Sequence, residues 1–278
     1  MITLISIELQ KIFRKWRTYI GFLAVLALTI IIQLAFYLTR DSYIQGTTRS
    51  LNDSFILNGN FFNGYVIAYL FLNLMFVHIP FLIVLVGGDI FAGEATAGTY
   101  RMLLTRPVSR LGLVTAKYLA GLIYTFLFIL FIGLMSLGVS LLLFGSGELI
   151  AMKNKIIIYA SNDILWRMVW AYSFTILSML TVMAISIFFS SMVSNAIGPI
   201  VATMAIIIVF LILSAIPVDF LQNIRPYFFT SHLTQWNEFF NDPVDFNEVA
   251  KSALILIAHI VGLYLLTAWA FIKKDILS

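Results

Sequence analysis

The sequence contains no cysteine and only three histidines among its 278 residues. Disulfide bonds and thiolate metal sites are therefore excluded, and a histidine-rich metal site is disfavoured. Charged residues are also scarce, at 11% of the chain against about 25% in ordinary soluble domains. The chain thus has too little polar surface to cover a soluble globule.

Hydrophobic residues make up 61% of the chain, and several apolar runs reach 18 residues or more. Such runs predict a polytopic membrane protein, and in lipid each run is expected to be a helix because its backbone must satisfy its own hydrogen bonds. We therefore predict an all-α fold with a single transmembrane domain over residues 1–278. The six spans are expected at about 19–38, 65–86, 118–144, 168–190, 196–216 and 252–272.

The N-terminal segment, residues 1–18, has the basic start of a signal peptide. The apolar run that follows, from Tyr19 to Leu38, is about twenty residues long, and no small-residue cleavage site comes after it. A retained spanning helix therefore fits better than a cleaved signal.

The basic residues predict how the spans are oriented. Six spans place both termini on one side, and that side carries ten Lys and Arg residues against seven on the other. Four of the ten directly precede the first span, namely Lys11, Arg14, Lys15 and Arg17. The positive-inside rule then predicts a multi-pass protein of the cell inner or plasma membrane with both termini in the cytoplasm.

Three loops are expected on the opposite side, at 39–64, 145–167 and 217–251. The second contains KIIIYASND, which fits a strand or a surface-lying segment. The third is rich in aromatic residues, which favour the headgroup level and predict short interfacial helices. These residues are Tyr227, Phe228, Phe229, Trp236, Phe239 and Phe240.

A polar stretch, GGDIFAGEATAGTYRMLLTRPVSR, opens the predicted cytoplasmic loop 87–117. Gly87 and Gly88 are expected to loosen the end of the second span, and Gly93 and Gly98 to allow sharp turns. The residues TYRMLLTR between Gly98 and Pro107 predict a short helix.

This short helix is expected to be amphipathic and to stand out from the membrane. Thr99 is a plausible N-cap, and Pro107 disfavours helix at Arg106. Tyr100, Leu103 and Leu104 share one apolar face, while Arg101 and Thr105 lie on another. The apolar face has little of its own chain to cover it, so it could pack in the groove of a partner or lie on lipid.

The string GDxFAGExxxGTxRxLLxRPVSRxxLxxAKYLAG resembles the cytoplasmic loop of the permeases of type-2 ABC exporters. The closest subgroup is the six-span permeases that include the membrane subunit of the nitrous-oxide reductase maturation transporter. The ending FIKKDIL, with Lys273 and Lys274, is also similar to the C-terminus of that family. The matching residues in the loop are Glu94, Gly98, Thr99, Leu103, Leu104, Arg106, Pro107, Ser109, Arg110 and Lys117.

The resemblance implies a transport subunit rather than an enzyme. Two permease copies, expected as a homodimer or as a pair with a similar chain, would stand above two copies of a separate ABC ATPase subunit. ATP and magnesium would bind to that ATPase, since this chain has no GxxxxGK[ST] phosphate cradle and needs no cofactor of its own. The residues implied to couple to the ATPase are Glu94, Gly98, Thr99, Tyr100, Arg101, Leu103, Leu104, Arg106, Pro107 and Arg110.

The resemblance also implies an N-terminal amphipathic helix on the cytoplasmic surface of the bilayer. In ISIELQKIFRKW the apolar residues recur with helical spacing, so that basic residues such as Lys11 and Lys15 are expected to face lipid phosphates. The apolar face comprises Ile5, Leu9, Ile12, Phe13 and Trp16.

The sequence allows two interpretations of the role of several polar residues. Glu94, with Asp89, fits either a charge lock to arginines of the ATPase or of the N-terminal helix, or a solvated carboxylate. Polar groups inside spans fit either the lining of a cargo path or a hydrogen bond between packed helices, and the second reading is the more common. The residues concerned are Gln33, Asn73 and His78.

Other classes of protein fit the sequence less well. No protease motif, paired membrane aspartates or filter-like segment occurs, and no basic tract interleaved with aromatics indicates nucleic acid. The expected function is ATP-driven export of an amphipathic, lipid-like or antibiotic-like cargo. The alternative is a membrane subunit that transmits ATPase motion to an extracytoplasmic partner protein through loop 217–251, without a cargo crossing a pore.

Overall fold

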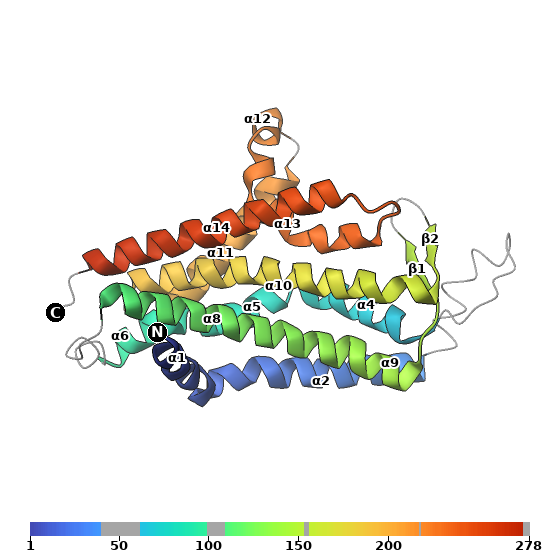
Figure 1. Cartoon of the computed structure of the whole chain (residues 1–278), viewed down its shortest axis with the longest axis horizontal. Helices are drawn as coiled ribbons and strands as arrows, with labels where there is room; N and C mark the ends of the chain where they lie inside the picture. Colours follow the sequence, from blue (N-terminus) through green and yellow to red (C-terminus); the bar gives the residue numbers. More distant parts are fainter. Residues whose placement is uncertain (40–61, 99–108, 153–155, 217, 275–278) are drawn as a thin grey trace, which may run out of the picture.

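The computed structural model describes residues 1–39, 62–98, 109–152, 156–216 and 218–274, which form an elongated bundle of helices (Figure 1). The elements up to the hairpin are α1 (Ile2–Arg14), α2 (Trp16–Leu38), α4 (Gly64–Phe76), α5 (Ile79–Gly87), α6 (Asp89–Thr96), α8 (Arg110–Gly133), the π-helix η1 (Leu134–Gly138), α9 (Val139–Phe144), β1 (Leu149–Met152) and β2 (Ile156–Tyr159). Those after it are α10 (Ser161–Met192), α11 (Ile197–Ala215), α12 (Asp219–Gln222), the 3-10 helix η2 (Arg225–Tyr227), α13 (Phe229–Leu233), the 3-10 helix η3 (Thr234–Phe240) and α14 (Phe246–Lys273).

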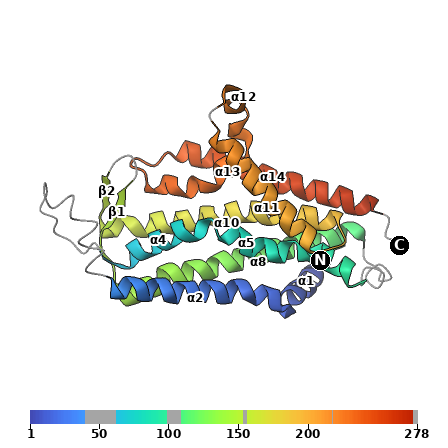
Figure 2. The same cartoon turned by 180° about the vertical axis from the view of Figure 1, so that it is seen from behind.

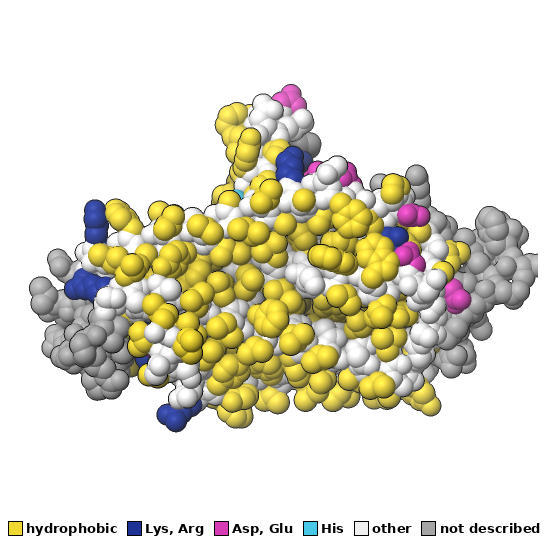
Figure 3. Space-filling view, in the orientation of Figure 1, with side chains coloured by type: hydrophobic (Ala, Val, Ile, Leu, Met, Phe, Trp, Pro, Cys, Tyr) yellow, Lys and Arg dark blue, Asp and Glu magenta, His cyan; other side chains and the backbone are white. Residues whose placement is uncertain are grey.

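The bundle has two distinct ends. Helices α1 and α6 and the last turn of α14 lie at one end, called the basic end below (Figures 1 and 2). The strands β1 and β2 pair antiparallel at the opposite end, called the hairpin end. On the face seen in Figure 3, hydrophobic side chains cover most of the surface between the two ends.

Six helices are long and apolar enough to cross a membrane, which confirms the predicted membrane character. They comprise Trp16–Leu38, Ile79–Thr96, Arg110–Phe144, Ser161–Met192, Ile197–Ser214 and Phe246–Lys273. Helix α10 is the central one, because 67% of its most apolar window is buried, against 22% for α2, α11 and α14. Helices α14, α8 and α5 pack around it.

The second apolar run differs from its prediction as one span over 65–86. It is broken at Val77 and His78, where the amide of His78 donates to the Met75 carbonyl in a tight turn. Pro80 explains the break, since it lacks an N–H and stands in the first turn of α5, where that loss costs nothing. Helix α5 then continues into α6, so that the candidate span runs from Ile79 to Thr96.

The paired glycines at the end of α5 do not loosen it, contrary to prediction. Gly88 has ordinary helical angles, with φ −63°. A Cβ on Gly87 would lie 2.7 Å from the Ser186 hydroxyl of α10, and one on Gly88 would lie 2.7 Å from Ile200 of α11. These glycines therefore allow three helices to approach closely. Gly98 does form the expected turn, with φ +65°.

The segment KIIIYASND was expected to be a strand or a surface-lying segment, and its residues Ile156–Tyr159 form strand β2, which confirms the first alternative. The chain is therefore mostly helical rather than all-α. The aromatic residues of the 217–251 loop are mainly core residues, because Phe229, Trp236, Phe239 and Phe240 are buried. The Ser178 hydroxyl of α10 donates to the Leu233 carbonyl, which fixes α13 against the bundle.

Candidate functional site at the basic end

Four charged side chains close a ring between α1, α6 and α8. Nζ of Lys11 lies 2.6 Å from Glu8 Oε1 and 2.8 Å from Glu94 Oε1. Nζ of Lys117 lies 2.7 Å from Glu8 Oε2 and 2.7 Å from Glu94 Oε2. Each carboxylate thus bridges both ammonium groups, and the ring has no net charge. We call these four residues the charge ring.

Three members of the charge ring are withdrawn from solvent, and the fourth, Lys11, is 36% exposed. Only 1% of the Lys117 side chain is exposed, with 7% for Glu8 and 10% for Glu94. A buried charge is tolerated only when it is paired, so the alternation of sign around the ring is what allows Lys117 to stand inside the bundle. Nζ of Lys117 also donates to the Ile90 carbonyl at 3.3 Å.

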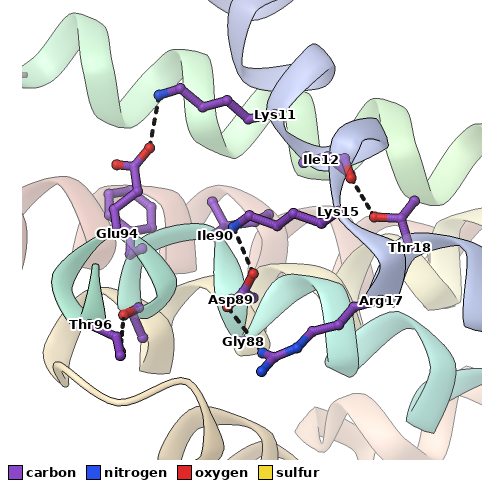
Figure 4. A network of polar contacts seen from close by, with 12 residues as sticks. Lys11, Ile12, Lys15, Arg17, Thr18, Gly88, Asp89, Ile90, Glu94 and Thr96 are labelled. Carbon is purple, nitrogen blue, oxygen red and sulfur yellow. Dashed lines mark hydrogen bonds and ion pairs between the residues drawn. The ribbon is translucent and has the colours of Figure 1, made fainter. Parts of the chain in front are cut away.

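Burial and pairing act in opposite directions on Lys11. Burial favours its neutral form, whereas hydrogen bonds to Glu8 and Glu94 favour the ammonium, and the net result is a pKa raised above the usual 10.5. Lys11 therefore remains a cation throughout the physiological range. This placement corrects the expectation that Lys11 faces lipid phosphates, because it faces the carboxylates of its own chain (Figure 4).

A second charge cluster joins the elbow between α1 and α2 to the start of α6. Lys15 Nζ lies 2.7 Å from Asp89 Oδ2, and Arg17 Nη1 lies 3.2 Å from Asp89 Oδ1 (Figure 4). The hydroxyl of Thr18 donates to the Ile12 carbonyl and holds the elbow closed. Gly93, one turn after Asp89, leaves room for the carboxylate, since a Cβ there would overlap it.

The junction between α5 and α6 is held by Ser190 of α10, which the sequence did not single out. Its hydroxyl accepts from the amides of Phe91 and Ala92, each at 3.0 Å, and donates to the Gly88 carbonyl at 2.7 Å. The side chain thus stands between backbone groups that an unbroken helix would join directly. Ser190 therefore fixes the direction in which α6 leaves α5.

Arg110 and Lys274 tie three helix ends together. Arg110 Nη1, at the start of α8, donates to the Ile272 carbonyl at 2.9 Å and to the Lys274 carbonyl at 3.2 Å. Lys274 Nζ donates to the Ser191 carbonyl at the end of α10 at 3.0 Å. These cations satisfy carbonyl groups that helix C-termini leave without partners. Burial lowers the pKa of Lys274.

The predicted coupling residues fall into two groups. Glu94 lies in the charge ring, Gly98 forms the turn after α6 and Arg110 binds the end of α14. The remaining predictions lie outside the described residues: Thr99, Tyr100, Arg101, Leu103, Leu104, Arg106 and Pro107. Helices α6 and α8 flank this part of the chain, and the charge ring joins the last turn of α6 to the second turn of α8.

The three polar residues of the spans have different surroundings. Gln33 is buried and donates to the Ser140 hydroxyl at 3.1 Å, a hydrogen bond between packed helices. Asn73 and His78 are exposed on the lateral surface, and the bonds found for them go to the carbonyls four residues earlier, Tyr69 and Leu74, both at 2.9 Å. Gln33 thus matches the packing reading.

Arg167, at the hairpin end, is a buried cation that the sequence reasoning missed. It pairs with Asp163 at 2.8 Å, donates to the Phe239 and Asn241 carbonyls at 2.9 Å each, and stacks 4.5 Å from the ring of Tyr159. It therefore joins α10, β2 and η3. An Asp and an Arg four residues apart at a helix start could have indicated part of this site.

The described residues contain no group of three or more His, Cys, Asp or Glu side chains placed to hold a metal ion. The carboxylates at the basic end are instead engaged by ammonium and guanidinium groups. A cavity of about 20 Å³ lies between the two charge clusters, enough for roughly one water molecule. The charged side chains at this end thus join segments that are far apart in the sequence.

The fold and the charge clusters together define a helical membrane protein whose N-terminal helix is locked to the segments around residues 99–108. Residues 26–277 match a family described as "Protein of unknown function (DUF2705)". The chain belongs to this family. No curated protein matches the chain.

Proposed function

We propose that the chain is the permease subunit of an ATP-driven ABC exporter of the type-2 kind. The observation that carries the proposal is the charge ring, which joins the N-terminal helix to both segments that flank residues 99–108. The resemblance of that loop to exporter permeases supplies the partner. Two copies of a separate ATPase would bind ATP and magnesium, and their movement would reach this chain through the loop.

The contacts of α6 supply a route for that movement. A force on the loop passes through α6 to α1 by way of Glu94, and to α10 by way of Ser190. It passes through α8 to the same ring by way of Lys117. Helices α1, α6 and α8 therefore move together, or the charge ring must open, as the transmission of ATPase motion requires.

The proposed cargo path lies where two copies of the chain meet. Asn73 and His78 are exposed on the lateral face of α4 and at its junction with α5, among apolar side chains. Polar groups in such places usually face other protein or a cavity, because hydrocarbon cannot satisfy them. A second permease copy would cover them, with an amphipathic or lipid-like cargo between the copies.

The test is purification of the chain from its native host in mild detergent, with mass spectrometry of the co-eluting proteins. A P-loop ATPase is expected, and its amount should fall sharply in a variant with Leu103→Asp and Leu104→Asp. The matched control is Leu51→Asp, in a loop predicted on the other side of the membrane. A chain that elutes without an ATPase from active membranes would refute the proposal.

The alternative function is transmission of ATPase motion to an extracytoplasmic partner, and one observation favours it. Helix α10 runs without a break for 32 residues, about 48 Å, and carries Arg167 near one end and Ser190 near the other. It thus connects α6 directly to η3. Site-specific cross-linking from the exposed Phe220 of α12 distinguishes the two functions, since capture of a specific protein partner would favour the second.

A further inference from the structure

A groove separate from the charge ring opens at the basic end. It has a volume of about 530 Å³ and lies between the α1–α2 elbow, helix α6 and the start of α11. Three of its lining residues come from the elbow: Lys15, Trp16 and Arg17. Asn195, Ala196 and Ile197 supply the opposite wall.

The groove has an excess of positive charge. Lys15 and Arg17 share the single carboxylate of Asp89, and their side chains are 43% and 53% exposed. Two cations thus face one anion in a place that a solute can reach. Helix α11 begins in the wall, where Asn195 Oδ1 accepts from the amide of Ile197, and its N-terminal end adds positive partial charge.

An apolar surface continues from the groove along the two helices that start there. On α2 it includes Tyr19, Ile20 and Leu23, and on α11 it includes Ile197 and Val201, all of them exposed. Trp16 is 73% exposed at the point where the polar and apolar surfaces meet. Tryptophan and basic residues in this order are typical of the boundary between headgroups and hydrocarbon.

We propose that the groove binds the phosphate of an anionic phospholipid, whose acyl chains lie along α2 and α11. The phosphate competes with Asp89 for Lys15 and Arg17, so the bound lipid weakens the link between the elbow and α6. A free anion would gain the charge contacts alone, whereas a lipid also covers the exposed apolar side chains. The site follows from the groove itself and is independent of the proposed function.

The test uses the full chain in nanodiscs and the quenching of Trp16 fluorescence by brominated lipid. The Trp16 signal is obtained as the difference between the unchanged chain and Trp16→Phe. Brominated phosphatidylglycerol is expected to quench it with about fivefold preference over brominated phosphatidylcholine, the factor that one net cation near a surface supplies. Equal quenching by the two lipids would overturn the proposal.

Three variants distinguish lipid binding in the groove from general attraction of anionic lipid to the basic end. Lys15→Gln with Arg17→Gln should abolish the preference, whereas Arg14→Gln, an exposed neighbour outside the groove, should retain it. Asp89→Asn leaves both cations and removes their competitor, so the preference should rise, an effect that mere loss of folding would not give. An equal loss in Arg14→Gln, or no rise in Asp89→Asn, would overturn the site.

Inorganic phosphate added to the same nanodiscs identifies the source of the anion. The quenching by phosphatidylglycerol should be unchanged, because the lipid is held by its acyl chains as well as by its charge. Relief of quenching by phosphate would show that the groove takes a free anion, and the assignment to a lipid would be wrong.

Discussion

Lys117 on α8 and Glu94 on α6 lie 2.7 Å apart, nitrogen to oxygen, with 1% of the lysine side chain exposed. A charge so deeply buried is tolerated only when it is paired. Its two partners, Glu94 and Glu8, come from different helices, so the position of α1 and that of α6 are linked through one ammonium group.

Replacement of Lys117 should therefore destabilise the chain strongly. Lys117→Met leaves Glu8 and Glu94 buried with only Lys11 between them, and removal of one partner from a buried pair costs about 3–5 kcal/mol. The measurement is the unfolding free energy of the purified chain in one detergent. Lys251→Met, an exposed lysine of α14, is the control and should change it by less than about 0.5 kcal/mol. Equal effects of the two changes would contradict the role of the ring.

Ser190→Ala should loosen the junction between α5 and α6. The change leaves the amides of Phe91 and Ala92 and the carbonyl of Gly88 without their present partner, at a cost of about 1–3 kcal/mol. Hydrogen exchange of the two amides should accelerate. Ser173→Ala is the matched control on the same helix, because that hydroxyl is exposed and its bond goes to its own helix at Val169. Unaltered exchange at Phe91 and Ala92 would contradict the role of Ser190 at this junction.

Gly93→Ala should break the second charge cluster without altering any charge. The new methyl group would overlap the carboxylate of Asp89 and push it away from Lys15 and Arg17. The unfolding free energy of the purified chain in one detergent should therefore fall in the variant. Gly262→Ala serves as control, since a Cβ there meets nothing within 4 Å, and helix propensity alone favours it by about 1 kcal/mol.

The docking of α1 should weaken at high pH. The raised pKa of Lys11 means that its contribution to docking is complete below its usual value of 10.5 and is lost as the pH rises through the higher folded-state value. Because the chain has no cysteine, a spin label at Gln10→Cys reports on α1 alone. Its mobility should rise only above about pH 10.5. Lys11→Gln should give a more mobile label already at neutral pH, and identical mobility in both chains would contradict the prediction.

The spans could be predicted because they depend on composition and length, which the sequence shows directly. The break at His78 was harder to predict. The sequence shows Pro80, but a proline also fits inside a kinked span. The glycines at 87 and 88 were misjudged for a similar reason. A glycine serves flexibility or close approach equally well, and only the neighbours Ser186 and Ile200 decide between them.

The charge ring could be predicted only in part. The prediction for Glu94 included a charge lock to arginines of the N-terminal helix, and its partner on that helix is instead a lysine, Lys11. Glu8 was missed because the apolar spacing of α1 directed attention to Ile5, Leu9 and Ile12, whereas Glu8 is itself buried on the face toward α8. Pairs between residues 8, 94 and 117 require the fold before they can be found.

If α1 separates from α6 and α8, the charge ring divides between Glu8 and Lys11 on one side and Glu94 and Lys117 on the other. Glu8 and Lys11 leave together with α1, and they already form an ion pair with each other at 2.6 Å. Glu94 and Lys117 stay behind, and they too are an ion pair. Separation therefore yields two electrically neutral halves, each with its own partner retained. The contact of α1 with α6 and α8 can therefore be broken and formed again without leaving an unpaired charge in either half.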